Sequence, residues 1–149
     1  MFSVTWLSEL NDQPSLIYWP EEHNFDTVPH NDVGFTSLLV NDLQLELGEN
    51  GRIIAVWGLC AQTTWKSAAL SAPVAPPGEV RFNDPANLVP GIAIRLNPRR
   101  SWPVLFDRQS GWVCIDSSQA TACAVTVMTG VIVEIDGAGC LVRLWLHPK

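Results

Sequence analysis

The chain has 149 residues, of which 47% are hydrophobic and 16% are charged, a balance that fits one globular domain with its own core and excludes a disordered chain. Its formal net charge of −6 disfavours nucleic acid and anionic membranes as partners, because both require a basic surface. The longest uncharged stretch, residues 117–133, falls short of the roughly 20 apolar residues that a membrane-spanning helix needs, so we expect a soluble, cytoplasmic protein.

The first half of the chain predicts one clear β-hairpin. Residues 1–13 show neither the basic region nor the apolar core of a signal peptide, and residues 8–12 are a helix candidate. Apolar residues then recur mostly with a period of two, which indicates strands. The leucines of 42–47 share one face, the turn sequence Gly-Glu-Asn-Gly at 48–51 tolerates positive φ, and 52–57 returns as the second strand.

The second half predicts one short helix, a proline-rich loop and several strands. Residues 64–70 (TWKSAAL) place good helix formers after a threonine cap, and the prolines that follow end any helix. The segment 71–78 (SAPVAPPG) is predicted to be a stiff surface loop, so that residues 1–149 form a single domain. Alternating runs between turn residues predict further strands at 79–83, 92–97, 102–107 and 111–116.

The strongest hairpin signal closes the chain, where residues 131–135 and 140–146 flank the turn sequence DGAG. This spacing makes Glu134 and Arg143 diagonal neighbours across the two strands. The apolar hairpin 131–146 also offers a possible edge for a homo-oligomer. The whole pattern predicts a mainly-β fold, a single-domain antiparallel β-sandwich or barrel of about ten short strands with one or two short helices.

The sequence contains no motif of a large enzyme class. The patterns GxxxxGK[ST], GxGxxG after a strand and HExxH are absent. The cysteines form no CxxC pair and no zinc spacing, and each lies beside apolar residues, which indicates buried, reduced thiols; they are Cys60, Cys114, Cys123 and Cys140. We therefore expect no metal, no cofactor and no catalytic residue, and we expect that the protein is not an enzyme.

Residues 21–32, EEHNFDTVPHND, place two histidines among four carboxylates, and three interpretations are open. Metal ligation would need both histidines presented together, but Pro29 lies between His23 and His30, so no helix presents them. Acid–base catalysis would pair a histidine with Asp26 or Asp32, but no nucleophile context accompanies it. The third interpretation, an acidic loop that contacts a partner, requires neither geometry.

The stretch 57–65, WGLCAQTTW, is the second distinctive segment. Trp57 continues the alternation of the preceding strand and is predicted to lie in the core, and Trp65 is predicted to pack the short helix onto the sheet. The alternative is a stacking platform for a sugar or a base. The only basic pair, Arg99 and Arg100, lies at a predicted turn and is interpreted as solvated.

Charge is distributed unevenly along the chain. Residues 1–49 contain nine acidic residues and no Lys or Arg, whereas residues 50–149 contain all nine basic residues and the other six acidic ones. Clustered charge of one sign costs stability through self-repulsion, but it steers a partner of opposite sign and excludes wrong partners. We therefore predict a partner-binding surface formed by Glu21, Glu22, Asp26, Asp32, Asp12 and Glu49.

The length, the acidic balance, the β-rich pattern and the W-G-x-C…W segment at 57–65 resemble the small immunity proteins of bacterial toxin systems, including contact-dependent growth inhibition. The resemblance implies a compact cytoplasmic protein that binds a cognate toxin domain, often a basic nuclease, and blocks it. It assigns no contact residue by position. A nuclease site must attract phosphate and is therefore positive, so carboxylates of an inhibitor can occupy it through charge-assisted hydrogen bonds.

The leading expectation is therefore an intracellular inhibitory protein that neutralises a basic toxin domain with an acidic surface. One alternative is a structural or assembly β module of a larger bacterial complex. Another is a small hydrolase or a ligand-binding β-barrel.

Overall fold

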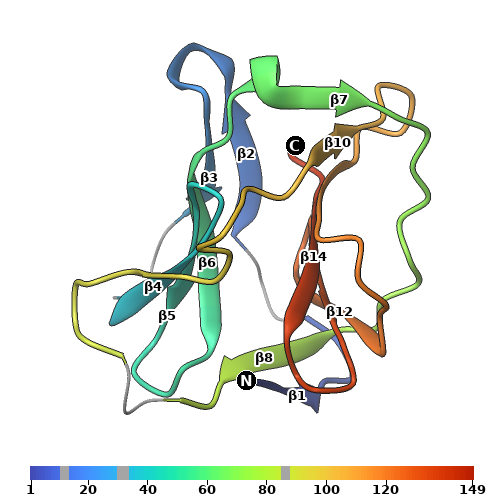
Figure 1. Cartoon of the computed structure of the whole chain (residues 1–149). Coiled ribbons are helices and arrows are strands. Elements are labelled where there is room, and N and C mark those ends of the chain that lie inside the picture. Colours follow the sequence, from blue (N-terminus) through green and yellow to red (C-terminus); the bar gives the residue numbers. More distant parts are fainter. Residues whose placement is uncertain (11–13, 30–33, 85–87) are drawn as a thin grey trace.

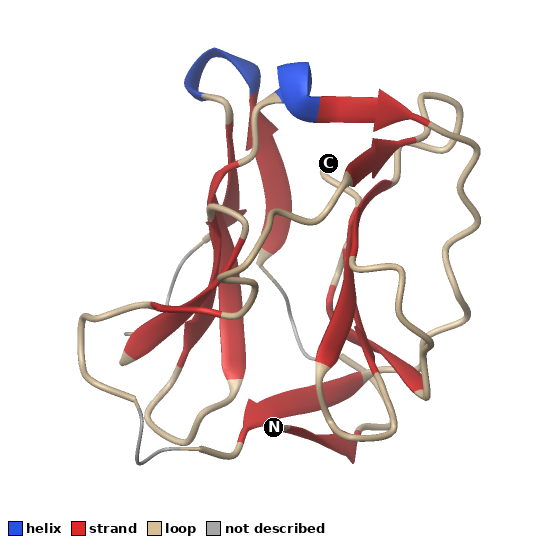
Figure 2. Cartoon of the chain, in the orientation of Figure 1, coloured by secondary structure: helices blue, strands red, loops and turns tan. Residues whose placement is uncertain are grey.

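A computed structural model describes residues 1–10, 14–29, 34–84 and 88–149 (Figure 1). Their backbone is mainly β, with fourteen strands and two short 3-10 turns, as Figure 2 shows. Over these ranges no helix is long and apolar enough to cross a membrane. The two turns are η1 (Pro20–Glu22) and η2 (Gln62–Thr64).

The strands form two six-stranded sheets and one two-stranded sheet. The N-terminal sheet has the order β2-β3-β6-β5-β4-β9 and consists of β2 (Ser15–Trp19), β3 (Asn24–Val28), β6 (Ile53–Leu59), β5 (Leu43–Leu47), β4 (Thr36–Val40) and β9 (Ile94–Arg95). The C-terminal sheet has the order β12-β13-β14-β11-β10-β7 and consists of β12 (Cys123–Met128), β13 (Val131–Ile135), β14 (Leu141–Leu146), β11 (Val113–Asp116), β10 (Val104–Phe106) and β7 (Trp65–Ser67).

The two large sheets stand face to face, and β1 (Phe2–Trp6) pairs with β8 (Gly78–Phe82) across one end, at the bottom of Figure 1. One apolar core joins the facing sides, because alternate side chains of both sheets point inward. It includes Leu38, Leu43, Leu45 and Val56 of one sheet and Val113, Ile115, Val133 and Leu144 of the other. The architecture is a β-sandwich and not a closed barrel, which confirms the predicted fold class.

The hairpin predicted over residues 42–57 is present as β5 and β6, but it contains a β-bulge. Glu46 pairs with Ala55 and Leu47 pairs with Ile53, so Ile54 is the additional residue. An additional residue reverses the side on which the rest of a strand points. Trp57 therefore faces outward, opposite Gln44, and the prediction that it lies in the core is wrong.

The helix predicted over residues 64–70 is also wrong. The segment forms η2 and then β7, which pairs in parallel with β10. The Trp65 ring, partly buried, contacts Tyr18, Phe25 and Phe106 at centroid distances of 5.1, 6.1 and 5.2 Å. These tertiary contacts outweigh the modest helix preference of the alanines. In the other helix candidate, 8–12, Ser8 to Leu10 are not helical and the rest lies outside the described residues.

The final hairpin is present as β13 and β14, with a register different from the predicted one. A bulge follows Glu134, so this residue lies directly opposite Arg143 and not diagonal to it. The hairpin also does not lie at the edge of its sheet, because β12 and β11 flank it. Every residue of β13 is buried. The prediction that 131–146 offers an edge to a second subunit therefore has no support in the fold.

The proline-rich segment forms a strap along the outer side of the C-terminal sheet, from β7 to β8 at the right of Figure 1. We call residues 68–77 the strap. Thr126 anchors it by donating from its hydroxyl to the Ala75 carbonyl at 2.6 Å and from its amide to the Pro76 carbonyl at 3.0 Å. Leu70, Ala72 and Ala75 pack on a second apolar cluster that includes Cys114, Ile132, Trp145 and Trp112. The outer side of this sheet is therefore covered.

Candidate functional site

The outer side of the N-terminal sheet carries large apolar side chains that remain exposed. Trp19, Asn24 and Leu59 form one row across β2, β3 and β6, and Trp57 lies in the next row, opposite Gln44. Trp19 is 42% exposed, Trp57 37% and Leu59 57%. We call this surface, centred on Trp19, Trp57 and Leu59, the open face. Exposed aromatic and aliphatic side chains gathered on one face are typical of a site for a protein partner.

Three of the predicted acidic residues lie on the hairpin that β2 and β3 form beside this apolar centre. Glu21 and Glu22 are exposed in η1, which connects the two strands. The turn is closed by His23, whose backbone adopts φ 57° and whose amide donates to the Pro20 carbonyl. Asp26 lies on β3 in the same alternation as Asn24, so it also faces outward.

The other predicted contact residues are not brought to this hairpin. Glu49 lies in the turn between β5 and β6. Because Asn24 at the start of β3 pairs with Leu59 at the end of β6, that turn is at the opposite end of the sheet from η1. Asp12 and Asp32 lie outside the described residues, as does His30. The described part of the predicted surface is therefore the group Glu21, Glu22 and Asp26.

The arginines that form ion pairs mostly use acidic residues of the later part of the chain. Arg52 and Arg81 contact Glu79 at 3.3 and 2.8 Å, and Arg143 contacts Asp116 at 2.8 Å and Glu134 at 3.5 Å. From the acidic first third, Asp42 pairs with Arg95 at 3.3 Å. Within the described ranges, no ion pair engages the acidic group of the β2–β3 hairpin, so its negative charge faces solvent.

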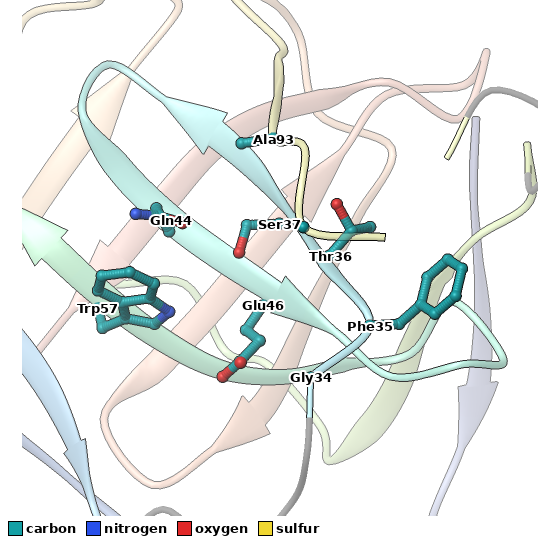
Figure 3. Close-up of a pocket in the computed structure, with 9 residues that line it drawn as sticks. Gly34, Phe35, Thr36, Ser37, Gln44, Glu46, Trp57 and Ala93 are labelled. Atoms are coloured by element: carbon teal, nitrogen blue, oxygen red, sulfur yellow. The ribbon is translucent and has the colours of Figure 1, made fainter. Parts of the chain in front are cut away.

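A pocket of about 270 Å³ opens on the same sheet, next to Trp57. Figure 3 shows the side chains of Trp57, Gln44, Ser37 and Glu46 around it, contributed by β6, β5 and β4. Gly34, Phe35, Thr36, Gly91 and Ala93 complete the lining. Sequence reasoning missed Gln44 and Glu46. The signal was present in the run DLQLEL, where these two are the polar positions between buried leucines.

The described residues do not assemble a metal site. No group of three or more His, Cys, Asp or Glu side chains in these ranges could hold a metal ion. His23 is exposed at the end of η1. A catalytic histidine would need an orienting carboxylate and a nucleophile within hydrogen-bond reach.

Two of the four cysteines, Cys60 and Cys114, are buried thiols with raised pKa values. Burial raises the pKa of Cys60, whose sulfur also accepts a hydrogen bond of 3.3 Å from the indole of Trp65. Burial, assisted by the charges of Asp116 and Glu134, raises the pKa of Cys114 to about 12. Both thiols are therefore protonated at neutral pH. All four cysteines are free, but Cys123 is only half-buried and Cys140 is exposed, so the prediction of four buried thiols is wrong for Cys140.

Comparison with protein-family models and with curated proteins finds no significant match. The open face and its charges are therefore the features from which a function is inferred.

Proposed function

We propose that this chain is an inhibitory binding protein that presents its open face to a basic protein, as an immunity protein does to its toxin. The observation that carries the proposal is the position of Trp19, Trp57 and Leu59 beside the uncompensated carboxylates of the β2–β3 hairpin. Protein interfaces have this composition, with aromatic residues in the centre and charged residues at the rim.

The two parts of the face have different physical roles. The aromatic and aliphatic side chains supply binding free energy through burial, and the largest losses on substitution occur at such residues. The carboxylates accelerate encounter with a positive surface and accept charge-assisted hydrogen bonds from its Arg and Lys side chains. A toxin domain that acts on phosphodiesters fits this surface, because its active site must be positive. Inhibition in the cytoplasm by occlusion needs no catalytic group, cofactor or metal from this chain.

The test uses the C-terminal domain of the protein encoded directly upstream of this chain in its genome. Calorimetry measures binding, and growth of cells that express both proteins measures neutralisation. The variant Glu21→Lys/Glu22→Lys/Asp26→Lys is expected to weaken binding by at least about tenfold at low salt, because three contacts become repulsive. Glu49→Lys is the matched control, since it makes the same change in charge at the opposite end of the sheet.

A second variant separates the apolar centre from the charges. Trp19→Ser/Leu59→Ser removes exposed apolar area without changing net charge, and we expect it to increase the dissociation rate while the association rate changes little. Full affinity and full neutralisation by both the charge variant and the apolar variant would contradict the proposal. So would absence of any binding or neutralisation by the unaltered chain.

A further inference from the structure

Residues of both large sheets line a second cleft, at the end of the sandwich where η2 and β7 connect one sheet to the other (top of Figure 1). Its volume is about 530 Å³, within the range of about 300–1,000 Å³ of small-molecule sites. We call it the inter-sheet cleft, and its whole lining belongs to the described part of the chain. We propose that the inter-sheet cleft binds a small carboxylate with an apolar body. This site does not depend on the proposed function.

The floor of the inter-sheet cleft is apolar, because core side chains of both sheets reach it. Leu43 belongs to β5 of the N-terminal sheet, and Val104 and Ile115 belong to β10 and β11 of the C-terminal sheet. All three are buried. Trp102 and Pro103 add apolar surface from the segment that leads into β10. The apolar body of a ligand therefore gains binding free energy by leaving water for this floor.

Hydrogen bonds within the chain hold the walls of the cleft in place. Between β4 and β5, the Asn41 side chain donates from Nδ2 to the Trp102 carbonyl at 3.0 Å, and its Oδ1 accepts from the Trp102 amide at 2.8 Å. On the other wall, the Cys60 amide donates to the His23 carbonyl at 2.8 Å, and the Cys60 sulfur accepts from the Trp65 indole at 3.3 Å. Walls that are already ordered lose little conformational entropy when a ligand binds.

The rim of the cleft carries a cation, Lys66. Thr64 and Lys66 both line the cleft, whereas Trp65 between them packs against the core, as the alternation of an extended segment requires. Over the described ranges, the Lys66 side chain enters no ion pair. The carboxylate of the lining, Asp42, is paired with Arg95 at 3.3 Å. The charge that the rim offers to a ligand is therefore positive.

This combination of an apolar floor and one cation selects a class of ligand. A carboxylate carries a single negative charge, which the ammonium group of Lys66 balances. A phosphate monoester carries about −1.5 to −2 and would leave negative charge beside Asp42. His23 and Ser101 belong to the same lining and offer an imidazole and a hydroxyl to the oxygen atoms of the head group. The apolar floor disfavours a fully polar ligand such as a sugar, whose hydroxyl groups would lose their hydrogen bonds to water.

The experiment titrates the full chain with phenylbutyrate and follows the indole N–H signals by NMR. The Trp102 signal is identified from its loss in Trp102→Phe. We expect a saturable shift of Trp102 with phenylbutyrate, roughly fivefold weaker binding of phenylbutyramide, which has the same shape without the charge, and no saturable shift with acetate, which lacks the apolar body. Lys66→Gln is expected to abolish the preference for the carboxylate over the amide. The matched control Lys149→Gln, outside the lining, is expected to retain it.

A second variant, Ala61→Trp, fills the cleft from its partly exposed edge and is expected to abolish binding of both compounds while the melting temperature stays within a few degrees. Absence of a Trp102 shift with phenylbutyrate, equal affinity for the amide, or full binding by Ala61→Trp would overturn the inference. A saturable shift with acetate of the same affinity would overturn it in favour of an ion at Lys66 only. Tighter binding of phenylbutylamine would overturn it in favour of a cation beside Asp42. Each of these results leaves the proposed binding of a basic protein unaffected.

Discussion

The buried carboxylate of Glu134 accepts a hydrogen bond of 2.9 Å from the indole N–H of Trp145, and both side chains lie on the side of the C-terminal sheet that the strap covers. Arg143 contacts the same carboxylate from the opposite strand at 3.5 Å and is held by Asp116 at 2.8 Å. Glu134 therefore satisfies a buried donor and is itself charge-compensated. A buried polar group whose hydrogen bonds are satisfied costs little folding free energy. Removing one partner leaves the other buried group without a hydrogen bond, and this is strongly destabilising.

Removal of the Glu134 carboxylate should therefore be strongly destabilising. Glu134→Leu leaves the Trp145 indole without an acceptor and the Arg143 charge with one partner fewer, and we expect a loss of about 2–4 kcal/mol in the free energy of unfolding. Glu134→Gln keeps an acceptor oxygen and is expected to lose less. Urea denaturation measures both. Equal stability of Glu134→Leu and the unaltered protein would contradict the role given to this hydrogen bond.

A second prediction concerns Gly58, which lies in β6 at φ 122°. A Cβ atom at this position would lie 3.0 Å from the Asp42 carbonyl oxygen, so an alanine meets both an unfavourable backbone region and a backbone neighbour. We expect Gly58→Ala to reduce the free energy of unfolding by about 1–3 kcal/mol. Gly137→Ala is the control, because nothing lies within 4 Å of its Cβ position. A comparable loss in both variants would refute the explanation.

The third prediction is the contribution of Glu79 to stability at acid pH. The hydrogen bond from Arg81, together with the bond and charge of Arg52, holds the pKa of Glu79 below its usual value against the opposing effect of burial. A group with a lowered folded-state pKa stabilises the fold above its unfolded pKa, about 4.3 for glutamate, and this contribution is lost as pH falls through the folded value.

Glu79→Gln removes the titrating group. Its melting temperature should therefore be lower than that of the unaltered protein at pH 6, and the difference should shrink as the pH falls below about 4. Calorimetric scans between pH 6 and pH 3 provide the measurement. Glu49→Gln, in an exposed turn, is the matched control. Its melting temperature should differ from that of the unaltered protein by the same amount at each pH. A constant gap for Glu79→Gln would count against the linkage.

The fourth prediction separates the cysteines by their accessibility. Cys140 is exposed, whereas Cys114 is buried and its pKa is raised to about 12. A thiol reagent at pH 8 should therefore modify Cys140 in the folded protein, and Cys114 only after denaturant is added, because the thiolate is the reactive form. Mass spectrometry of the modified peptides measures the two rates. Similar rates in the folded protein would show that the strap does not protect Cys114.

Alternation and turn residues were sufficient to predict the mainly-β fold and most of its strands from residue 42 onward. They could not reveal the bulges, because the one additional residue in β6, Ile54, is as apolar as its neighbours. This single residue moved Trp57 from the expected core to the open face. The short strand β7 was also beyond local reasoning, since its formation depends on Tyr18, Phe25 and Phe106, which lie far away in the sequence.

The sequence indicated only in part where the acidic residues lie in the fold. Residues 15–59 supply five neighbouring strands of one sheet, so the acidic first third of the chain indeed falls largely on one sheet. Antiparallel strands nevertheless send successive turns to alternate ends. Glu49 is therefore separated from Glu21 and Glu22 although all three lie in turns of this sheet.

The strap gives the sandwich two unequal sides. Trp145 lies in the cluster on which residues 68–77 pack and is buried, whereas Trp19 and Trp57 are exposed. The two sides of the sandwich therefore differ in how much indole surface a second molecule can reach.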